Sequence, residues 1–322
     1  MGSTHTMGGT LVVTLRQPPF CLCVPSIVAS RSSKATRFQR QTGRAAVVLE
    51  FIIGLFLTVA LLGCAPTEVE VVAIANEGFL VTSGRHAVLL DALFRATAQY
   101  PEFFQEAPSE NLLRRMIGGE GEFERVDLAL VSHVHQDHFN AETARAFLQH
   151  HPETILVSTE GVAAALAKLD GFGEIAERVL VPVRALGSCR RTEIKNIDVT
   201  ACLVPHAGGG DPDNMIFIVT IDGFRFFHEG DADMTRSAFE GLDLGDGGLH
   251  LAFMHGWYAT GDGRSIVTEL LHPRQLVLMH HRWAQASYER EAVDRLRPEH
   301  TAELPPITVF SAELERKRFQ IQ

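Results

Sequence analysis

The 322-residue sequence predicts an α/β fold in which β-sheets pack together and helices cover their outer faces. Two observations lead to this prediction. Apolar, β-branched runs broken by turn residues occur in two separate halves of the chain, and helical patterns follow in each half. The residues are 46% hydrophobic and 21% charged, as in ordinary globular proteins, and the chain is long enough to fill a large core.

The first half begins with strands and continues with alternating helices and strands. Its first three strands, over 69–75, 78–82 and 87–90, form a predicted meander with turns at Asn76-Glu77 and Ser83-Gly84. The later elements are a helix over 109–117, a buried strand over 126–131, a helix over 141–150 capped by Asn140, a strand over 154–157 and a helix over 161–169.

The pattern restarts near residue 179 and again changes from strands to helices. The strands are expected over 179–183, 190–194, 197–204, 215–221, 224–228 and 275–279. The helices are expected over 233–240, 264–271 and 287–295. The acidic loop Gly208–Asn214 is interpreted either as a lid or as a surface turn.

Residues 1–63 are interpreted as a signal segment rather than as part of the fold. Six basic residues and the single acid Glu50 precede an apolar run from Phe51 to Leu62. Twelve residues at about 1.5 Å each cannot cross a hydrocarbon core of roughly 30 Å, whereas they suit the apolar region of a signal peptide. An uncleaved anchor or a buried core segment is the alternative, and a true start near Arg40 would give a more ordinary basic region.

The segment ends in Leu61-Leu62-Gly63-Cys64, which resembles a bacterial lipobox. The resemblance implies a lipid on Cys64 and therefore an exported, membrane-anchored lipoprotein on the periplasmic or cell-surface side. Residues 64–322 contain 23 basic and 38 acidic residues, a net charge of −15. An acidic body without a basic stripe argues against nucleic acid as the main partner and favours a small-molecule substrate. The sequence does not indicate an oligomeric state.

The densest group of metal-binding side chains lies between a predicted strand and a predicted helix. The run Ser132–His138 contains His133, His135, Asp137 and His138. Imidazole and carboxylate are the ligands of zinc sites outside thiolate chemistry, and a turn between two rigid elements can hold them at the rim of a sheet. The run therefore predicts a metal site, with a clustered tract of surface histidines as the alternative.

The spacing His133-x-His135-x-Asp137-His138 after an apolar strand resembles the signature of the metallo-β-lactamase superfamily, from about Glu68 to the C-terminus. The resemblance implies a four-layer αβ/βα sandwich and two metal ions. In that family the first two histidines bind one ion, and the aspartate and third histidine bind the other. Three later strand ends supply the remaining implied ligands, which are His206, the bridging Asp231, and His280 with His281 as its rival.

Two departures from other branches favour hydrolysis with two Zn²⁺, with Mn²⁺ or Fe²⁺ as alternatives. Many true β-lactamases have Cys at the place of Asp231, and the diiron redox branch has Glu at the place of His135. The segments Asn76–Leu80, His228–Asp231 and Met279-His280 are most similar to the branch that contains the ascorbate-phosphate lactonase.

The implied chemistry uses a metal-bridging hydroxide to cleave a small ester, lactone or phosphodiester. Two ions about 3.5–4 Å apart lower the pKa of a shared water toward neutrality, and Asp137 would orient the hydroxide as well as bind metal. His228 and His255 are the candidates to protonate the leaving group. For His228, orienting a ligand or packing stays open. The loop His255–Tyr258 is expected to line the substrate pocket, with an ordinary loop histidine as the alternative.

Two other functions compete with this one. The first is a nuclease or phosphodiesterase of the same fold, against which the acidic charge speaks. The second is a non-catalytic metal-binding lipoprotein. A complete set of ligands argues against that role, because relatives that have lost catalysis usually lose metal ligands as well. Metal analysis together with assays on phosphodiester and lactone substrates would separate the two functions.

Two of the five cysteines, Cys189 and Cys202, lie symmetrically about Lys195-Asn196. If those two residues form a hairpin turn, the cysteines face each other at a non-hydrogen-bonded position, where side chains are closest. The sequence therefore predicts a cross-strand disulfide, which would agree with export. Two half-buried free thiols are the alternative.

Overall fold

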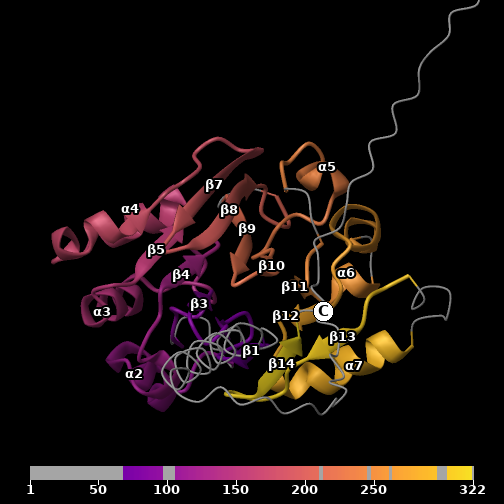
Figure 1. The fold of residues 1–322 in the computed structure, drawn as a ribbon, viewed down its shortest axis with the longest axis horizontal. Helices are drawn as coiled ribbons and strands as arrows, with labels where there is room; N and C mark the ends of the chain where they lie inside the picture. The colour runs from indigo at the N-terminus through magenta and orange to yellow at the C-terminus, as the bar shows by residue number, and fades with distance from the viewer. Residues whose placement is uncertain are drawn as a thin grey trace, which may run out of the picture. The chain divides into compact units, whose positions relative to one another are not determined.

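Two seven-stranded sheets form the centre of the fold (Figure 1). The computed structural model describes residues 68–96, 106–209, 213–244, 248–260, 263–295 and 303–320. The strand orders are β14-β1-β2-β3-β4-β5-β6 and β13-β12-β11-β10-β9-β8-β7. The signal segment and Cys64 lie outside the described residues, so export and lipid attachment stay predictions. Among the described residues, no helix is both long and apolar enough to cross a membrane.

Each sheet is antiparallel in one part and parallel in the other. In the first sheet β1, β2 and β3 pair antiparallel and the next three strands pair parallel; in the second, antiparallel pairing extends from β7 to β10 and parallel pairing from β10 to β13. The strands of the first sheet are β1 (Glu68–Ala73), β2 (Phe79–Thr82), β3 (Ala87–Leu90), β4 (Leu128–Val131), β5 (Ile155–Ser158), β6 (Val179–Leu180) and β14 (Arg316–Gln320). Those of the second are β7 (Ser188–Ile194), β8 (Ile197–Val204), β9 (Asn214–Ile221), β10 (Phe224–His228), β11 (Leu251–His255), β12 (Leu276–Met279) and β13 (Ile307–Val309).

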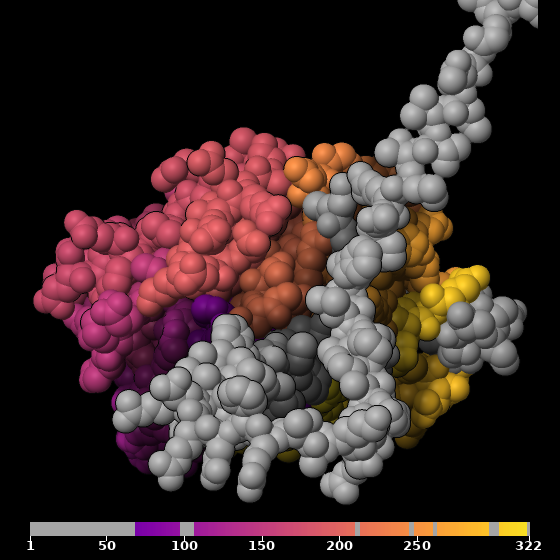
Figure 2. Space-filling view, viewed as in Figure 1, coloured from indigo at the N-terminus to yellow at the C-terminus, as the bar shows by residue number. Residues whose placement is uncertain are grey.

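Helices cover the outer face of each sheet. Figure 1 shows α2, α3 and α4 beside the first sheet and α5, α6 and α7 beside the second. In the space-filling view of Figure 2 the magenta part of the chain lies on one side and the yellow part on the other. The helices of the first side are α2 (Glu110–Gly118), α3 (Ala141–His150) and α4 (Glu160–Ala167). Those of the second side are α5 (Arg236–Phe239), α6 (Trp257–Thr260), the π-helix η4 (Ile266–Leu271) and α7 (Ala286–Asp294). Short 3₁₀ turns are η1 (Gly121–Phe123), η2 (Phe172–Glu174), η3 (Ala176–Arg178) and η5 (Trp283–Gln285).

The alternation of apolar side chains along the strands explains why both faces of each sheet are covered. In β9, Met215, Phe217 and Val219 belong to the core between the two sheets, whereas Ile216 and Ile218 belong to the core beneath the second group of helices. A third core lies between the first sheet and α2, α3 and α4. The predicted four-layer αβ/βα sandwich is therefore confirmed.

Three strands are missing from the sequence prediction, and one predicted helix has a different form. Strand β11 is short and has no β-branched residue, and β13 has only three residues. Strand β14 is rich in charge because it is an edge strand paired only with β1. The predicted helix over 264–271 is a π-helix from Ile266, and the expected loop after His255 contains the single helical turn α6.

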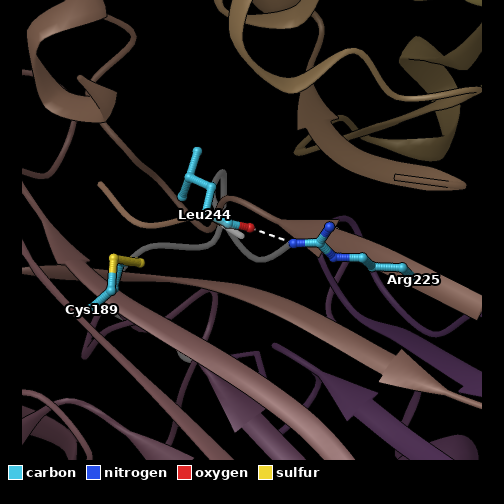
Figure 3. Close-up of a disulfide and its surroundings, with 4 residues drawn as sticks. Cys189, Arg225 and Leu244 are labelled. Atoms are coloured by element: carbon cyan, nitrogen blue, oxygen red, sulfur yellow. Dashed lines mark hydrogen bonds between the residues drawn. A yellow bond between two sulfur atoms is a disulfide. The ribbon is translucent and has the colours of Figure 1, made fainter. Parts of the chain in front are cut away.

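The predicted disulfide between Cys189 of β7 and Cys202 of β8 is confirmed, and the two residues are paired in the strand register (Figure 3). Lys195 and Asn196 both have positive φ angles, 52° and 61°, as a two-residue type I′ hairpin requires. Figure 3 also shows the hydrogen bond that Arg225 of β10 donates to the carbonyl of Leu244 near the disulfide.

The turn after β10 approaches the end of β4 so closely that only glycine fits. Gly230 has a φ of +60°, and a Cβ atom there would lie 2.4 Å from both the Ser132 Cβ and the Asn214 Oδ1. Asn214 also donates to the Glu229 carbonyl and accepts from the Asp231 N–H. The side chain that follows Gly230 is therefore placed by contacts between the two sheets.

We predict that replacing both Cys189 and Cys202 by serine lowers the free energy of unfolding by about 3 kcal/mol. The bridge closes a loop with a sequence separation of 13, which restricts the unfolded chain by roughly that amount. Denaturant unfolding without reductant measures the difference. With reductant, the wild type and the variant should become equally stable; equal stability without reductant would contradict the prediction.

We also predict that Gly230→Ala is more destabilising than Gly223→Ala. Both glycines have positive φ angles, but a Cβ at Gly223 would meet nothing within 4 Å. Each variant should lose about 1–2 kcal/mol from the left-handed backbone, and Gly230→Ala about 1–3 kcal/mol more from the clash. Thermal unfolding compares them, and equal losses would show that the close approach is unimportant.

Candidate metal centre

Histidine and carboxylate side chains from both sheets meet at one edge, just beyond the ends of several strands. The turn after β4 contributes His133 to His138, and β8 and β10 lead into His206 and Asp231. His255 ends β11, and His280 follows β12. These positions explain how residues nearly 150 positions apart in the sequence come together.

The first group consists of His133, His135, His206 and Asp231, whose ligand atoms all lie within 4.8 Å of one another. The Asp231 Oδ2 lies 3.4 Å from the His206 Nε2 and 3.9 Å from the His133 Nε2. The His135 and His206 rings meet edge to face at 4.6 Å. Three imidazoles and one carboxylate are a set of ligands that suits zinc.

The second group consists of Glu77, Asp137, His138 and His280, again within 4.8 Å of one another. The His280 Nε2 lies 2.9 Å from the Glu77 Oε1 and 3.6 Å from the Asp137 Oδ2. The two groups together bring all seven predicted ligands to one place. Glu77 is an eighth member that the sequence prediction does not contain.

Asp231 lies between the two groups. Its Oδ1 is 3.2 Å from the His138 Nε2, and its Oδ2 faces the imidazoles of the first group and lies 3.7 Å from the His280 Nε2. This is the position expected for a bridging carboxylate. A third set of atoms that could hold a cation, from Asp231, His255 and His280, overlaps both groups.

Buried acceptors orient the histidine rings through their Nδ1 atoms. The His138 Nδ1 lies 2.9 Å from Asp91, and the His255 Nδ1 lies 2.6 Å from Glu229. The His206 Nδ1 lies 2.7 Å from the carbonyl of Ala207. An Nδ1–H that donates to such an acceptor leaves the Nε2 lone pair free to bind a metal ion.

Backbone hydrogen bonds also connect the segments that carry the site. The Ala207 N–H donates to the Asp231 carbonyl, and the His280 N–H donates to the Asn76 carbonyl, at 2.7 and 2.9 Å. His280 has a φ of 59°, a left-handed conformation that is unfavourable for a residue with a Cβ. Such strain persists only where surrounding contacts impose it, and it is common at functional sites.

The charges of the two groups differ. Burial and the charge of His138 lower the pKa of His133 well below its usual value, and burial followed by His206 lowers the pKa of His135. For His138, burial acts in the same direction, but Asp231 and Glu77 outweigh it and raise its pKa well above the usual value. His133 and His135 of the first group are therefore neutral imidazoles.

In the second group the carboxylates dominate. Burial alone would lower the pKa of His280, but Glu77 and then Asp231 raise it well above its usual value. Burial would raise the pKa of Asp137, but the hydrogen bond and charge of His280, with the charge of His138, lower it to about 2. Asp231 likewise has a pKa held well below its usual value, against burial, by His138 and His280. Asp137 and Asp231 are thus ionised, and the positive charge of His138 and His280 compensates them.

The ligand atoms fit divalent ions. Within the described part of the chain, no hydrogen-bond partner exists for the buried Nε2 atoms of His133, His138, His206 and His255, nor for the Asp231 Oδ1. Buried polar atoms without partners are rare because leaving them unpaired is unfavourable. Their convergence on one place, around ionised carboxylates, is what a metal centre requires.

The remaining predicted residues are all buried but face different partners. His255 faces Asp231, with 3.4 Å between its Nε2 and the Oδ1, and its ring stacks on Trp257 at 4.1 Å. His228 is fully buried behind the site, where its Nε2 lies 3.8 Å from Asp91 and its Nδ1 accepts from the Gly230 N–H. His281, the rival of His280, turns away and lies 2.9 Å from the Phe310 carbonyl.

Three buried acids at this edge are absent from the sequence prediction: Glu77, Asp91 and Glu229. Asp91 also accepts from the Ser132 N–H and hydroxyl at 2.7 and 2.6 Å. Each acid lies beside a short run of apolar residues, and Asp91 and Glu229 directly follow β3 and β10. For Asp91 and Glu229, the sequence signal that could have identified them is a single acid directly after an apolar strand.

Comparison with known proteins agrees with the fold. A family model described as the beta-lactamase superfamily domain matches residues 73–280. No curated protein matches the chain. Solved structures of similar fold include Igni18, a metallo hydrolase from Ignicoccus hospitalis, with 18% identity, a TM-score of 0.51, and coverage of 80% of this chain and 100% of that one.

Two further structures have the same fold at low identity. The isothiocyanate hydrolase from Delia radicum gut bacteria is 16% identical, with a TM-score of 0.50 and coverage of 78% of this chain and 100% of that one. CmlA, a diiron β-hydroxylase from Streptomyces venezuelae, is 13% identical, with a TM-score of 0.50 and coverage of 80% and 55%. These likenesses support the fold, whereas the family match covers most of the chain and includes all seven predicted ligands. The protein belongs to the beta-lactamase superfamily.

Proposed function

We propose that the protein is a hydrolase that holds two zinc ions and cleaves a small ester, lactone or phosphodiester. The observation that carries this proposal is the position of Asp231 between two groups of ligands. Membership of the superfamily and the metallo hydrolase among the structural neighbours support metal-dependent hydrolysis. The net charge of −15 over residues 64–322 favours a small substrate over a nucleic acid.

The residues divide into two metal positions that share one carboxylate. His133, His135 and His206 would hold the first ion, Asp137, His138 and His280 the second, and Asp231 would bridge them. When bound, such a pair of ions lowers the pKa of water and polarises the oxygen of a scissile carbonyl or phosphoryl group.

Asp137 is suited to orient the attacking water. Its side chain is 16% exposed, so it can be reached from solvent, and its pKa of about 2, set by His280 and His138 against the effect of burial, keeps it ionised. An ionised carboxylate accepts hydrogen bonds without donating any. Asp137 therefore holds a water by its proton while leaving the oxygen lone pair free for attack.

His255 is suited to move a proton at its Nε2. Glu229 holds the other ring nitrogen, and burial together with the charge of His280 lowers the pKa of His255 well below its usual value. A neutral imidazole oriented in this way can take a proton from water and pass it to the leaving group. The ring nitrogens of His228 face Asp91 and the Gly230 N–H, so we assign His228 the alternative role of positioning Asp91 and the Gly230 turn.

The substrate contact beside His255 is aromatic. Trp257 is 39% exposed and stacks on the His255 ring with an interplanar angle of 9°. An exposed tryptophan face next to catalytic groups offers apolar contact to a flat or hydrocarbon part of the substrate. This supports the expectation that the segment from His255 to Tyr258 lines the substrate pocket, although Tyr258 itself is fully buried.

Zinc is our choice for the first position because three imidazoles form it. The same fold accepts iron in CmlA, which is named a diiron β-hydroxylase. His135, at the place where the redox branch has Glu, supports zinc hydrolysis instead.

We further propose that the protein is exported and attached to the membrane by a lipid on Cys64. The lipobox-like ending of the signal segment and the disulfide support this location, because disulfides persist mainly in oxidising compartments. Metabolic labelling with a radioactive fatty acid, compared with a Cys64→Ala variant, tests the attachment.

The hydrolase proposal predicts that chelation abolishes turnover of a chromogenic phosphodiester, lactone or carboxylic ester, and that two equivalents of Zn²⁺ restore it. Asp231→Ala should lose both metal binding and turnover, since both positions share that carboxylate. Elemental analysis and initial rates measure the two properties. Two tightly bound zinc ions without turnover of any of these substrates would instead favour the non-catalytic metal-binding function.

His255→Gln is expected to lower kcat and kcat/KM together by about 10²–10⁴-fold while both zinc ions remain bound, because it removes a proton carrier. His151→Gln is a matched control. That histidine is also buried, but it lies at the end of α3 beside the Met116 carbonyl, so its replacement should not change kcat. Loss of a zinc ion from His255→Gln would identify His255 as a ligand, and an unchanged kcat would exclude its role in proton transfer.

A further inference from the structure

The turn between β1 and β2 carries a buried carboxylate that is not among the predicted ligands. Glu77 has no exposed surface and points to the second group of ligands. Its Oε1 accepts from the Asn76 side chain at 2.7 Å and lies 2.9 Å from the His280 Nε2 and 3.8 Å from the His138 Nε2. Its Oε2 is buried and has no hydrogen-bond partner among the described residues.

Burying a carboxylate is unfavourable unless positive charge and hydrogen bonds compensate it. The fold nevertheless positions Glu77 firmly. The His280 N–H donates to the Asn76 carbonyl, and the Ile74 N–H donates to the Gly78 carbonyl at 2.8 Å. A Cβ at Gly78 would lie 3.1 Å from the Cβ of Ala92, so the turn is pressed against the segment after β3. Glu77 is therefore held in place beside His280 by contacts on both sides of the turn.

We propose that Glu77 is an additional ligand of the second metal position and that it makes the two positions chemically unequal. This inference rests on the proposed function, because it requires two bound ions. The first position has three imidazoles and shares Asp231, whereas the second has Glu77 and Asp137, shares Asp231, and has two imidazoles.

The difference in ligands implies a difference in metal preference. Imidazole ligands suit zinc, whereas carboxylate oxygens favour harder ions such as Mn²⁺. With three carboxylates, the second position also carries more negative charge to attract a divalent ion. The first position should therefore favour Zn²⁺ strongly, and the second should discriminate less and accept Mn²⁺. The alternative is that Glu77 only balances and orients His280.

The test is metal titration of the metal-free full chain with Zn²⁺ and with Mn²⁺, the latter followed by electron paramagnetic resonance. The wild type should bind two equivalents of metal. The ratio of its affinity for Mn²⁺ to its affinity for Zn²⁺ should be higher at the second position than at the first. Glu77→Gln should lower the affinity of the second position for Mn²⁺ by more than about 100-fold. A residue that merely orients a ligand costs about 10–100-fold, so the larger loss identifies a direct ligand.

Two further variants complete the experiment. Glu77→Asp keeps the charge but withdraws the carboxylate by one methylene group, and it should also lose Mn²⁺ from the second position. Asp127→Asn removes another buried carboxylate, one bonded to the Ala87 N–H and to Arg125 away from the metal groups, and should leave both affinities unchanged. Circular dichroism establishes that each variant is folded.

The outcomes separate this proposal from the proposed function. If the wild type binds two ions and hydrolyses its substrates while Glu77→Gln loses less than about 100-fold in second-site affinity, Glu77 is no ligand and the hydrolase proposal stands. If the wild type binds fewer than two ions, both proposals fail. Equal Mn²⁺ to Zn²⁺ ratios at the two positions would overturn the unequal preference.

Discussion

The carboxylate of Asp231 is the group on which the arrangement of the site depends. It lies within 4 Å of five imidazoles from four segments of the chain: His133, His138, His206, His255 and His280. The Asp231 side chain is only 12% exposed, and a carboxylate so largely removed from water is stable only when positive charge surrounds it. Its position in turn depends on Gly230, where no side chain fits, and on Asn214, which holds the backbone on both sides of that glycine.

A second layer of buried acids gives each histidine a defined orientation. Asp91 is bonded to His138 and to Ser132, whose hydroxyl lies 2.9 Å from the His133 Nδ1, so one carboxylate influences a histidine of each of the two groups. Glu229 does the same for His255. Burial raises the pKa of Glu229 well above its usual value, a consequence of placing an acid where water cannot reach it.

At this edge of the sheets, several residues have conformations or unpaired polar atoms that are unfavourable for stability but place the side chains of the site. Asp91 and His280 both have positive φ angles, and several imidazole nitrogens have no hydrogen-bond partner among the described residues. The fold tolerates these unfavourable contributions because large apolar side chains such as Phe79, Phe226 and Phe253 fill the core between the two sheets. Metal ions would supply the missing contacts and connect the function of the site to the stability of the fold.

Local patterns in the sequence were sufficient to predict packed sheets with helices outside, most strands and helices, the cross-strand disulfide and the group of His133, His135, Asp137 and His138. The four-layer arrangement came from the resemblance to a family. Alternating side chains, two-residue turns and cap residues act over a few positions, so they can be read without the fold. His206, Asp231 and His280 came from the resemblance to a family. Their convergence with the first group is a property of the two sheets.

Only the tertiary structure decided which of the scattered acids are buried. Glu77 occupies a sequence that is typical of an exposed turn, and Asp91 and Glu229 follow strands as many solvated residues do. His228 and His255 were indistinguishable as proton carriers until the fold placed one behind Asp91 and the other against Asp231. The physical reason is that burial depends on contacts between segments far apart in the chain, and these set the charge and direction of each side chain.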